Sequence, residues 1–388
     1  MKVGAYSVII SGYAFNSKLF NAEGHGNPLI RIRDVGKNKT ETFFNGEYPQ
    51  HAIVNNGDFL IGMDGDFRLC EWQGGKALLN QRVCKIVPDE RRVNTRYIMR
   101  LLPAELKRIE DKTSFATVKH LSVKKIKEID IPLPPLEEQK QIAAILDAAD
   151  ELRQKDKALI AKYDELTQSL FLDMFGDPVS NQKVWEVARL KDIALKIRSG
   201  NTPKGGSKVY VSKGVTFFRS QNVWKNLIKL EDVVFIDETT HCNMKNSSLK
   251  HGDILMTKTG RFNTENSSLG RAAMYLGKDD DANVNGHVYL IRLKDDVQNK
   301  FVLFILTTNQ YRNYIRRVCV GGIDKRQINK EHLEEFPIIQ PPLELQEKFS
   351  LVLTKIQAQK AIAHESLIQS EALFSSLLQK AFKGKLTN

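Results

Sequence analysis

The sequence predicts an α+β protein in which two globular regions are separated by two long antiparallel coiled-coil helices, arranged as a pseudo-two-fold internal repeat. The first observation is a duplicated hexapeptide, because Pro134-Pro135-Leu136-Glu137-Glu138-Gln139 recurs 207 residues later as Pro341-Pro342-Leu343-Glu344-Leu345-Gln346. The second is that apolar residues recur every seven positions after each hexapeptide. The third is that the rest of the chain alternates short β-branched and aromatic runs with turn residues, which is typical of sheets.

The repeat extends upstream of the hexapeptides. Gly57-Asp58-Phe59-Leu60 matches Gly252-Asp253-Ile254-Leu255, and Ser11-Gly12 matches Ser199-Gly200. A period of 207 residues is far longer than the about 20–50 residues of a solenoid unit. The chain therefore carries a duplicated module, a globular region followed by a helix. The four parts are predicted to be residues 1–133, 134–178, 179–340 and 341–388.

Each globular region is predicted to combine a sheet with a few helices. Runs such as 233–236 and 288–292 are rich in Val, Ile, Phe and Tyr, which favours buried strands. Near its end each region carries a helical pattern, over 97–109 in the first and 301–317 in the second. The order of the strands is left open by the sequence.

The two long helices are predicted from their heptads. Proline at the start, glutamate in the first turn and Gly176-Asp177-Pro178 at the end of the first copy are helix start and stop signals. A run of about 38 residues would be roughly 57 Å long, and its narrow apolar seam requires a partner helix. We expect the following residues to pair the helices: Ile142, Ile145, Leu152, Leu159, Leu166, Leu170, Phe349, Val352, Ile356, Leu373 and Leu377.

Chain connectivity predicts that these helices run in opposite directions. The first helix leads almost directly into the second globular region, and that region ends where the second helix begins. If one compact domain joins them, the end of the first helix lies near the start of the second. The seam of the first helix includes a charged residue, Asp156, with Ala363 expected opposite.

The charge of the chain indicates a polyanionic partner. Its 58 Lys and Arg against 46 Asp and Glu give a formal net charge of +12 and a pI near 9.3. The globular regions carry +6 and +9, whereas residues 134–178 carry −5 and residues 341–388 carry +2. Two basic regions on a rigid spacer are typical of a protein that reads duplex DNA at two sites.

Composition excludes several other classes. With 41% hydrophobic and 27% charged residues, the chain is neither collagen-like nor wholly disordered. Its four cysteines are dispersed, which predicts reduced thiols and no structural zinc or other metal site. The longest apolar run, 301–306, is far shorter than the about 20 residues of a membrane span. We expect a cytoplasmic protein without a membrane partner.

Motifs at the helix ends point to a known family. The first helix closes with Phe175-Gly176-Asp177-Pro178 and the second with Phe382-Lys383-Gly384-Lys385-Leu386. The second globular region opens with Trp185-Glu186-Val187, Leu190-Lys191-Asp192-Ile193 and Ser199-Gly200-Asn201-Thr202-Pro203. With the two Pro-Pro-Leu-Glu-x-Gln helices, the chain resembles, over essentially its whole length, the DNA-specificity subunits of type I restriction-modification enzymes. The first globular region departs from this pattern because it lacks the Trp-Glu opening.

The resemblance implies a subunit without catalytic residues. Each globular region would be a target-recognition domain that reads one half of a split double-stranded DNA sequence. The paired helices would set the spacer and dock two adenine methyltransferase (modification) subunits, with ATP-driven restriction motor-nuclease subunits joining outside. S-adenosylmethionine, ATP and magnesium would be cofactors of those partner subunits, and none would bind to this chain.

Two patterns approach those of enzymes without matching them. Gly200–Ser207 is similar to a phosphate-binding loop, but Gly206 stands where the essential lysine is required. Pro88-Asp89 followed by Glu105-Leu106-Lys107 loosely matches a nuclease pattern, but the second part has the composition of a helix and not of the required strand. A self-contained nuclease and a coiled-coil adaptor with basic heads remain alternatives to a DNA-recognition subunit.

Candidate DNA contacts are basic residues in glycine-rich turns, where the backbone approaches phosphate and arginine reaches guanine O6 and N7. In the first region they are Lys18, Arg31, Arg33, Lys37, Arg68 and Arg82. In the second region they are Arg198, Lys204, Lys208, Arg219, Lys258, Arg261, Lys325 and Arg326. Polar side chains suited to adenine or thymine edges are Asn201, Thr202, Gln221 and Asn222.

Overall fold

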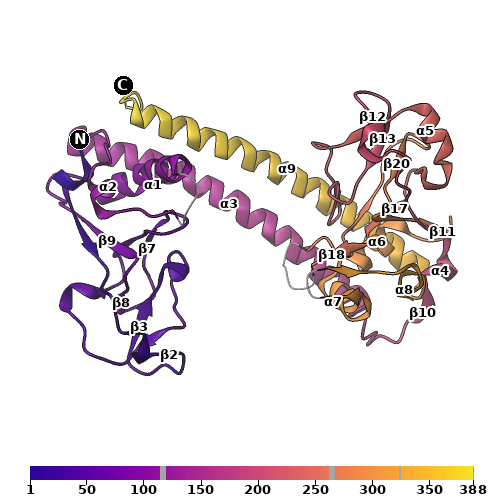
Figure 1. The fold of residues 1–388 in the computed structure, drawn as a ribbon, viewed down its shortest axis with the longest axis horizontal. Coiled ribbons are helices and arrows are strands. Elements are labelled where there is room, and N and C mark those ends of the chain that lie inside the picture. Colours follow the sequence, from indigo (N-terminus) through magenta and orange to yellow (C-terminus); the bar gives the residue numbers. More distant parts are fainter. Residues whose placement is uncertain (114–118, 262–266, 323–324, 388) are drawn as a thin grey trace. The chain divides into compact units, whose positions relative to one another are not determined.

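The computed structural model describes residues 1–113, 119–261, 267–322 and 325–387 and divides the chain into two compact units. The first unit comprises Met1–Ala158 and Ala363–Asn388, and the second comprises Leu159–Ile362. Each unit contains one globular part and one section of each long helix (Figure 1).

The first unit is built on a four-stranded antiparallel sheet. Its strands, in spatial order, are β1 (Ser7–Ser11), β9 (Val83–Pro88), β6 (Phe59–Gly62) and β7 (Leu69–Glu71). Helices α1 (Thr95–Lys112) and α2 (Val123–Lys127) contribute to the same hydrophobic core. Helix α1 buries Tyr97, Ile98 and Leu101 along one face, which explains why this segment is helical and confirms the prediction over 97–109.

A second, smaller sheet completes the first globular part. In spatial order its strands are β2 (Phe20–Asn21), β4 (Phe43–Phe44), β3 (Asn27–Ile30), β8 (Ala77–Leu79) and β5 (Ile53–Val54). Strands β3 and β8 are parallel, and the other pairs are antiparallel. Short 3₁₀ helices flank these strands: η2 (Ser17–Leu19), η3 (Ile32–Asp34) and η4 (Gln50–Ala52). A further one, η1 (Val3–Ala5), precedes β1 of the central sheet.

The second unit repeats the topology of the central sheet and has a four-stranded counterpart of the smaller sheet. Its central sheet has the order β11 (Ala194–Ser199), β21 (Val288–Leu293), β17 (Ile254–Thr257) and β19 (Ala272–Met274), again antiparallel throughout. Its smaller sheet has the order β12 (Tyr210–Val211), β16 (Val234–Ile236), β13 (Val215–Phe218) and β20 (Ala282–Val284), with β13 and β20 parallel. The strands predicted over 233–236 and 288–292 are both present.

Shorter elements surround these sheets in the second unit. The additional strand pairings are β10 (Glu186–Arg189) with β24 (Pro337–Gln340), β14 (Val223–Trp224) with β15 (Leu227–Ile228), and β23 (Arg326–Gln327) between β18 (Thr259–Gly260) and β22 (Val320–Gly321). The short helices are α4 (Leu190–Ile193), α5 (Glu238–Asn243), α8 (Lys330–Glu334), η5 (Gly206–Val209) and η6 (Lys245–Ser247).

The helix predicted over 301–317 is two helices, α6 (Asn299–Thr307) and α7 (Asn309–Val318). The break lies at Thr308, whose backbone is extended and whose side chain accepts a hydrogen bond from Tyr311 N–H. Thr308 therefore caps α7, and threonine is among the residues preferred at that position. The apolar pattern continued through the break because both helices bury residues in the same core.

The long helices are α3 (Leu136–Phe175) and α9 (Leu343–Phe382), close to the predicted bounds. The glutamine of each hexapeptide folds back on the prolines before the helix. The Gln139 amide donates to Pro134 O at 2.8 Å, and the Gln346 amide donates to Pro341 O at 2.8 Å. Helix α3 ends at Phe175 and is followed by Gly176, which has a φ of +74° suited to glycine. No helix among the described residues is long and apolar enough to cross a membrane.

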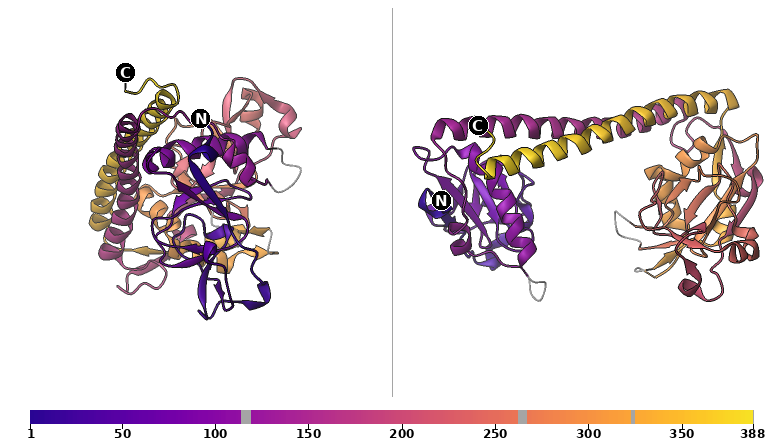
Figure 2. Two further views of the ribbon diagram at one scale, coloured as in Figure 1. Left: turned by 90° about the vertical axis from the view of Figure 1, so that its left-hand side faces the viewer. Right: turned by 90° about the horizontal axis from the view of Figure 1, so that it is seen from above.

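Within each unit, sections of α3 and α9 lie side by side and antiparallel (Figures 1 and 2). In the first unit, Asp156 accepts hydrogen bonds from Ser366 Oγ at 3.0 Å and Ser370 Oγ at 2.7 Å. In the second unit, Phe349 packs against Phe171 and Phe175. The predicted α+β class with two long antiparallel helices is confirmed. The hydrogen-bond donors to Asp156, Ser366 and Ser370, were not among the predicted pairing residues.

One half of the predicted seam needs correction. Ile142 and Phe349 are buried, and Ile356 is nearly so. Leu170, Val352 and Leu377 are half-buried. Five predicted pairing residues are exposed instead: Ile145, Leu152, Leu159, Leu166 and Leu373.

The second seam position lies four residues after the first, not three. Leu146 and Leu353 hold this position, and each is buried in the core of its own globular part. Each end of a long helix must cover a globular core, and that requirement sets the buried face. The apolar side chains three residues after the first seam position, such as Ile145 and Leu152, are consequently exposed to solvent.

Candidate nucleic-acid interface

The central sheets of the two units end in the same backbone arrangement. Gly12 N–H donates to Val83 O at 2.9 Å, and Gly200 N–H donates to Val288 O at 2.9 Å. A Cβ at Gly12 would lie 2.0 Å from Asn80 O, and one at Gly200 would lie 2.2 Å from Val284 O. Both positions therefore require glycine, which explains why the Ser-Gly pair occurs in both copies.

A second set of equivalent hydrogen bonds places the neighbouring loops. Met63 N–H donates to Arg82 O, as Lys258 N–H donates to His287 O, each at 2.9 Å. Met63 O accepts from Leu121 N–H, as Lys258 O accepts from Ile328 N–H. One scaffold thus presents different side chains at the same place in the two units, with Lys258 of the second unit standing where the first has Met63.

In the second unit this end of the sheet gathers several predicted contacts. Lys258 Nζ donates to Ser199 Oγ at 3.2 Å and lies 4.9 Å from the centroid of the Tyr289 ring. Arg326 lies on β23, paired directly with Gly260 of β18. The structure therefore brings together Lys258, Arg326 and the loop that begins at Ser199.

Most other predicted contacts of the second unit are free to meet a ligand. Asn201 is half-buried beside this end of the sheet, where its N–H donates to Val284 O at 3.1 Å. The exposed candidates are Arg198, Thr202, Lys204, Lys208, Arg261 and Lys325. Exposed cations of this kind are suited to contact with phosphate groups, which carry no sequence information.

Three predicted contacts are instead occupied by internal hydrogen bonds. Asn222 is buried, and its amide donates to Lys229 O and Asp232 O. Arg219 forms an ion pair with Asp232 at 3.1 Å, and Gln221 also bonds to that carboxylate. These residues hold the loop around the β14–β15 hairpin, so we do not retain Asn222 as a base contact.

In the first unit Arg82 lies at the end of the central sheet, in a cluster that sequence reasoning missed. His120 Nδ1 lies 2.7 Å from Asp64 Oδ1 and 3.2 Å from Arg82 Nη1. Arg82 Nε lies 3.5 Å from Asp64 Oδ2. Asp64 and His120 are 56 residues apart, and no local motif could have joined them. The cation at this end of the first unit is therefore neutralised by a carboxylate.

The remaining predicted contacts of the first unit are spread over its smaller sheet and loops. Lys18 and Lys37 are exposed, and Arg33 donates to Thr42 Oγ1 at 3.1 Å. Arg31 is half-buried, and its backbone N–H donates to Asp34 at 2.9 Å. The structure does not bring these four together with Arg82.

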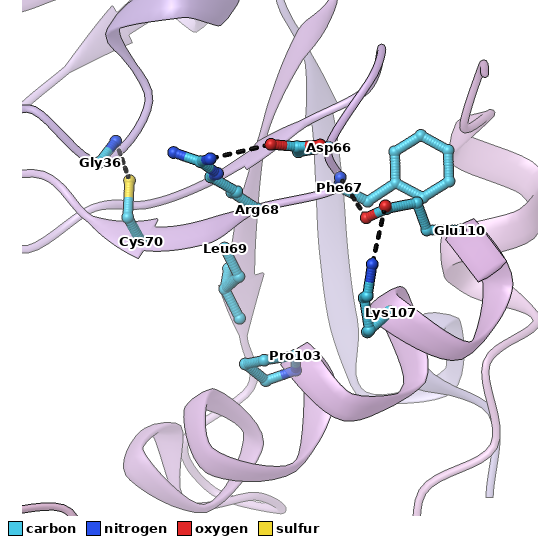
Figure 3. Close-up of a pocket in the computed structure, with 9 residues that line it drawn as sticks. All are labelled: Gly36, Asp66, Phe67, Arg68, Leu69, Cys70, Pro103, Lys107 and Glu110. Atoms are coloured by element: carbon cyan, nitrogen blue, oxygen red, sulfur yellow. Dashed lines mark hydrogen bonds and ion pairs between the residues drawn. The ribbon is translucent and has the colours of Figure 1, made fainter. Parts of the chain in front are cut away.

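Arg68 borders a surface pocket between β7 and α1 of about 420 Å³ (Figure 3). Asp66 pairs with Arg68 at 2.8 Å, and Glu110 pairs with Lys107 at 3.0 Å. Glu110 also accepts from Phe67 N–H at 3.3 Å. Each cation that lines this pocket is thus balanced by a carboxylate.

The residues of the loose nuclease pattern do not converge on a site. Glu105 and Lys107 lie on α1, where Glu105 pairs with Arg108 and Lys107 pairs with Glu110 and Asp111. Asp89 pairs with Arg91. In the part of the chain that the structure describes, no group of His, Cys, Asp or Glu could hold a metal ion.

Comparison with known proteins gives a consistent result. A family model described as type I restriction modification DNA specificity domain matches residues 6–162 and again residues 182–371. The EcoBI type I specificity subunit of Escherichia coli is 27% identical over 98% of this chain and 84% of that protein. The MjaVIII type I specificity subunit of Methanocaldococcus jannaschii is 24% identical over 87% of this chain and 81% of that protein.

Solved structures share the fold. The S subunit of a type I restriction-modification system from M. genitalium aligns with a TM-score of 0.57 at 14% identity, covering 98% of this chain and 95% of that one. A chain from a study of complex assembly and conformational transition of the type I R-M system aligns with a TM-score of 0.52 at 19% identity, covering 100% and 97%.

Proposed function

We propose that this chain, which belongs to the family of type I restriction-modification DNA-specificity proteins, reads one half of a bipartite DNA sequence with each of its globular parts. It is a specificity subunit, and we infer that it carries no catalytic residues of its own. The chemistry would belong to its partner subunits, together with their S-adenosylmethionine, ATP and magnesium.

The observation that carries this proposal is the duplicated scaffold at the ends of the two central sheets. The same backbone hydrogen bonds recur at Gly12 and Gly200, and at Met63 and Lys258. The side chains on that scaffold differ, with Arg82, His120 and Asp64 in one unit and Lys258 and Arg326 in the other. A protein that reads two different half-sites requires one frame with two sets of side chains.

The long helices supply surfaces for partner subunits. On the section of α3 in the first unit, Leu152 is 45% exposed, and in the second unit's section Leu166 is 50% exposed. Ile145 and Leu159 share their heptad position and are also exposed. Apolar residues regularly spaced in solvent indicate a protein-binding surface, and we propose that modification subunits dock there.

The decisive experiment is to map methylated adenines in DNA from cells that express this chain with its modification subunit. The expected result is one bipartite sequence, lost when this chain is deleted. Methylation without sequence preference would favour the coiled-coil adaptor. Magnesium-dependent cutting by the purified chain alone would favour the nuclease.

Exchanging one globular part tests the division of labour. Replacing residues 179–340 with the corresponding region of a related specificity subunit should change one half of the methylated sequence and leave the other half unchanged. A change in both halves would contradict independent reading by the two parts.

A further inference from the structure

The second unit carries a group of cations that the sequence analysis did not select. Lys225 lies at the tip of the β14–β15 hairpin, Arg271 directly precedes β19, and Arg312 lies on α7. The hairpin is joined to β19 by a hydrogen bond from Asn226 N–H to Ala272 O at 2.9 Å. Three segments that are distant in sequence therefore bring their cations to the start of one strand.

Arg312 is joined to the same strand, because its Nη1 donates to Gly270 O at 3.4 Å. The segment from Gly270 to Ala272 also contacts the end of the candidate interface. Thr257 N–H donates to Arg271 O at 2.9 Å, and Lys258 follows Thr257. The cation group therefore lies beside the loops that carry the candidate base contacts.

The indole of Trp224 fixes the orientation of two cations. Arg271 Cζ lies 3.8 Å from the ring centroid, and Lys229 Nζ lies 3.7 Å from it. Two cations this close to one centroid must occupy opposite faces of the ring. Trp224 Nε1–H donates to Gln221 O at 3.0 Å, which holds the indole in place. The guanidinium of Arg271 is thus positioned before any ligand arrives.

Two members of the group, Lys225 and Arg312, carry charges that no described carboxylate balances. Over the described residues, neither Lys225 nor Arg312 forms an ion pair with a carboxylate. Loss of hydration lowers the pKa of Lys225, and repulsion from Arg312 and Lys360 adds to it, although Asp164 opposes the shift. Partial burial, followed by Arg316 and Arg271, lowers the pKa of Arg312. An anion bound among these cations would relieve the repulsion.

The first unit carries an arginine at the position that corresponds to Arg271. Gly62 N–H donates to Arg68 O at 2.9 Å, as Thr257 N–H donates to Arg271 O, so Arg68 and Arg271 are equivalent. In the first unit Asp66 pairs with Arg68, and Glu110 pairs with Lys107 on the neighbouring helix (Figure 3).

We propose that Lys225, Arg271 and Arg312 form a binding site for phosphodiester groups of the DNA backbone. This site rests on the proposed function and adds to it, because it assigns a sequence-independent contact with the DNA backbone to the second unit. Arginine supplies a planar fork for phosphate oxygens, and lysine supplies a mobile point charge.

The test uses the full-length chain with Lys225→Met and Arg312→Met, singly and together, since methionine removes the charge and keeps the aliphatic stem. Binding to a short duplex of random sequence is measured over a series of salt concentrations. For each cation removed, the binding constant at 0.1 M salt should fall about eightfold, and the log–log salt slope should become shallower by about 0.9. Because the substitutions remove charges that repel one another, we expect no fall in the unfolding temperature.

Matched variants separate this site from general charge effects. Lys225→Arg should keep the salt slope, and Lys278→Met, an exposed lysine beyond the other end of β19, should leave binding unchanged. A folded double variant with wild-type affinity and slope would overturn the proposal. So would a variant that binds DNA normally but loses its modification subunit, because the ligand would then be an acidic protein surface.

The outcome is distinguishable from failure of the proposed function. Phosphate contacts do not specify bases, so the methylated sequence should be the same for the double variant and the wild type. A wild-type chain that does not bind duplex DNA would contradict the proposed function itself. Salt-dependent binding by the wild type, with no change in the variants, would contradict only this site.

Discussion

The two units share the strand order of their central sheets and one set of backbone hydrogen bonds, yet they differ in how charge is balanced beside those sheets. In the first unit Arg68 is balanced by Asp66, and Arg82 by Asp64. In the second unit Lys225 and Arg312 have no carboxylate partner among the described residues. The presence or absence of a neighbouring carboxylate therefore decides whether a cation in each unit is available to a polyanion.

The units also differ where α3 and α9 meet. The second unit packs five phenylalanines together at this point: Phe171, Phe175, Phe301, Phe304 and Phe349. The first unit instead buries the carboxylate of Asp156 with two serine hydroxyls. An aromatic cluster contributes free energy through apolar burial, whereas a buried polar contact contributes mainly by selecting one alignment.

The largest expected effect is on the aromatic cluster. Phe349→Ala should lower the free energy of unfolding of the second unit by about 3–5 kcal/mol, because it opens a cavity in a fully buried site. Urea denaturation followed by tryptophan fluorescence measures this change. Leu351→Ala, two residues along α9 and 60% exposed, is the matched control and should have little effect.

A smaller loss is expected at the polar contact of the first unit. Asp156→Ala should cost about 1–3 kcal/mol, because Ser366 and Ser370 lose their acceptor. Denaturation of the full chain measures it. A loss as large as that of Phe349→Ala would contradict this difference, because the polar contact would then contribute as much free energy as the aromatic cluster.

A third effect is expected when a cation of the first unit loses its carboxylate partner. Asp66→Asn removes the partner of Arg68, so affinity for a random duplex at 0.1 M salt should rise by up to about eightfold, with a slope steeper by up to about 0.9. The control is Asp130→Asn, which removes the same charge beside the first residue of the chain. Equal increases for both variants would show that only net charge matters.

The smallest expected effect depends on pH. Partial burial acts to raise the pKa of Asp150, but hydrogen bonds and charges from Arg100 and Arg153 outweigh it and lower the pKa below its ordinary value. The contact therefore stabilises the folded state above the unfolded-state pKa of about 3.9 and is lost as pH falls through the folded-state pKa.

Asp150→Asn should consequently cost under about 1 kcal/mol at neutral pH, since the pair is partly exposed. The difference from wild type should shrink as the pH is lowered below about 4. Urea denaturation at several pH values measures it, with Asp192→Asn in the second unit as a fully exposed comparison. A difference that grows in acid would contradict the direction of the pKa shift.

Sequence periodicity predicted the long helices well because their start and stop signals are local. Gln139 and Gly176 act within a few residues of the ends that they define. The break at Thr308 was missed because the apolar pattern passes through it. The second seam position was predicted one residue too early, because a heptad pattern permits a second apolar position either three or four residues after the first. Packing of Leu146 and Leu353 on the globular cores selects the position four residues after the first.

The candidate interface was only partly predictable for a different reason. Lys258 and Arg326 lie in segments whose composition indicates a turn, and the structure places both at the end of the sheet, with Arg326 on β23. Arg271 was missed although its equivalent, Arg68, had been selected. The grouping of Lys225, Arg271 and Arg312 depends on tertiary contacts between three segments, which no local pattern encodes.

The hydrogen bonds of Asp156 make the helix pairing intolerant of misalignment. A slip of one heptad between α3 and α9 would replace Ser370 with Ala363 or Leu377, and neither side chain can donate a hydrogen bond. Asp156 would then lose the donor of its 2.7 Å hydrogen bond, at a cost of about 1–3 kcal/mol for a buried acceptor that loses a partner. A repeating apolar seam alone would accept such a slip cheaply. One buried carboxylate therefore selects a single alignment of the α3 and α9 sections in the first unit.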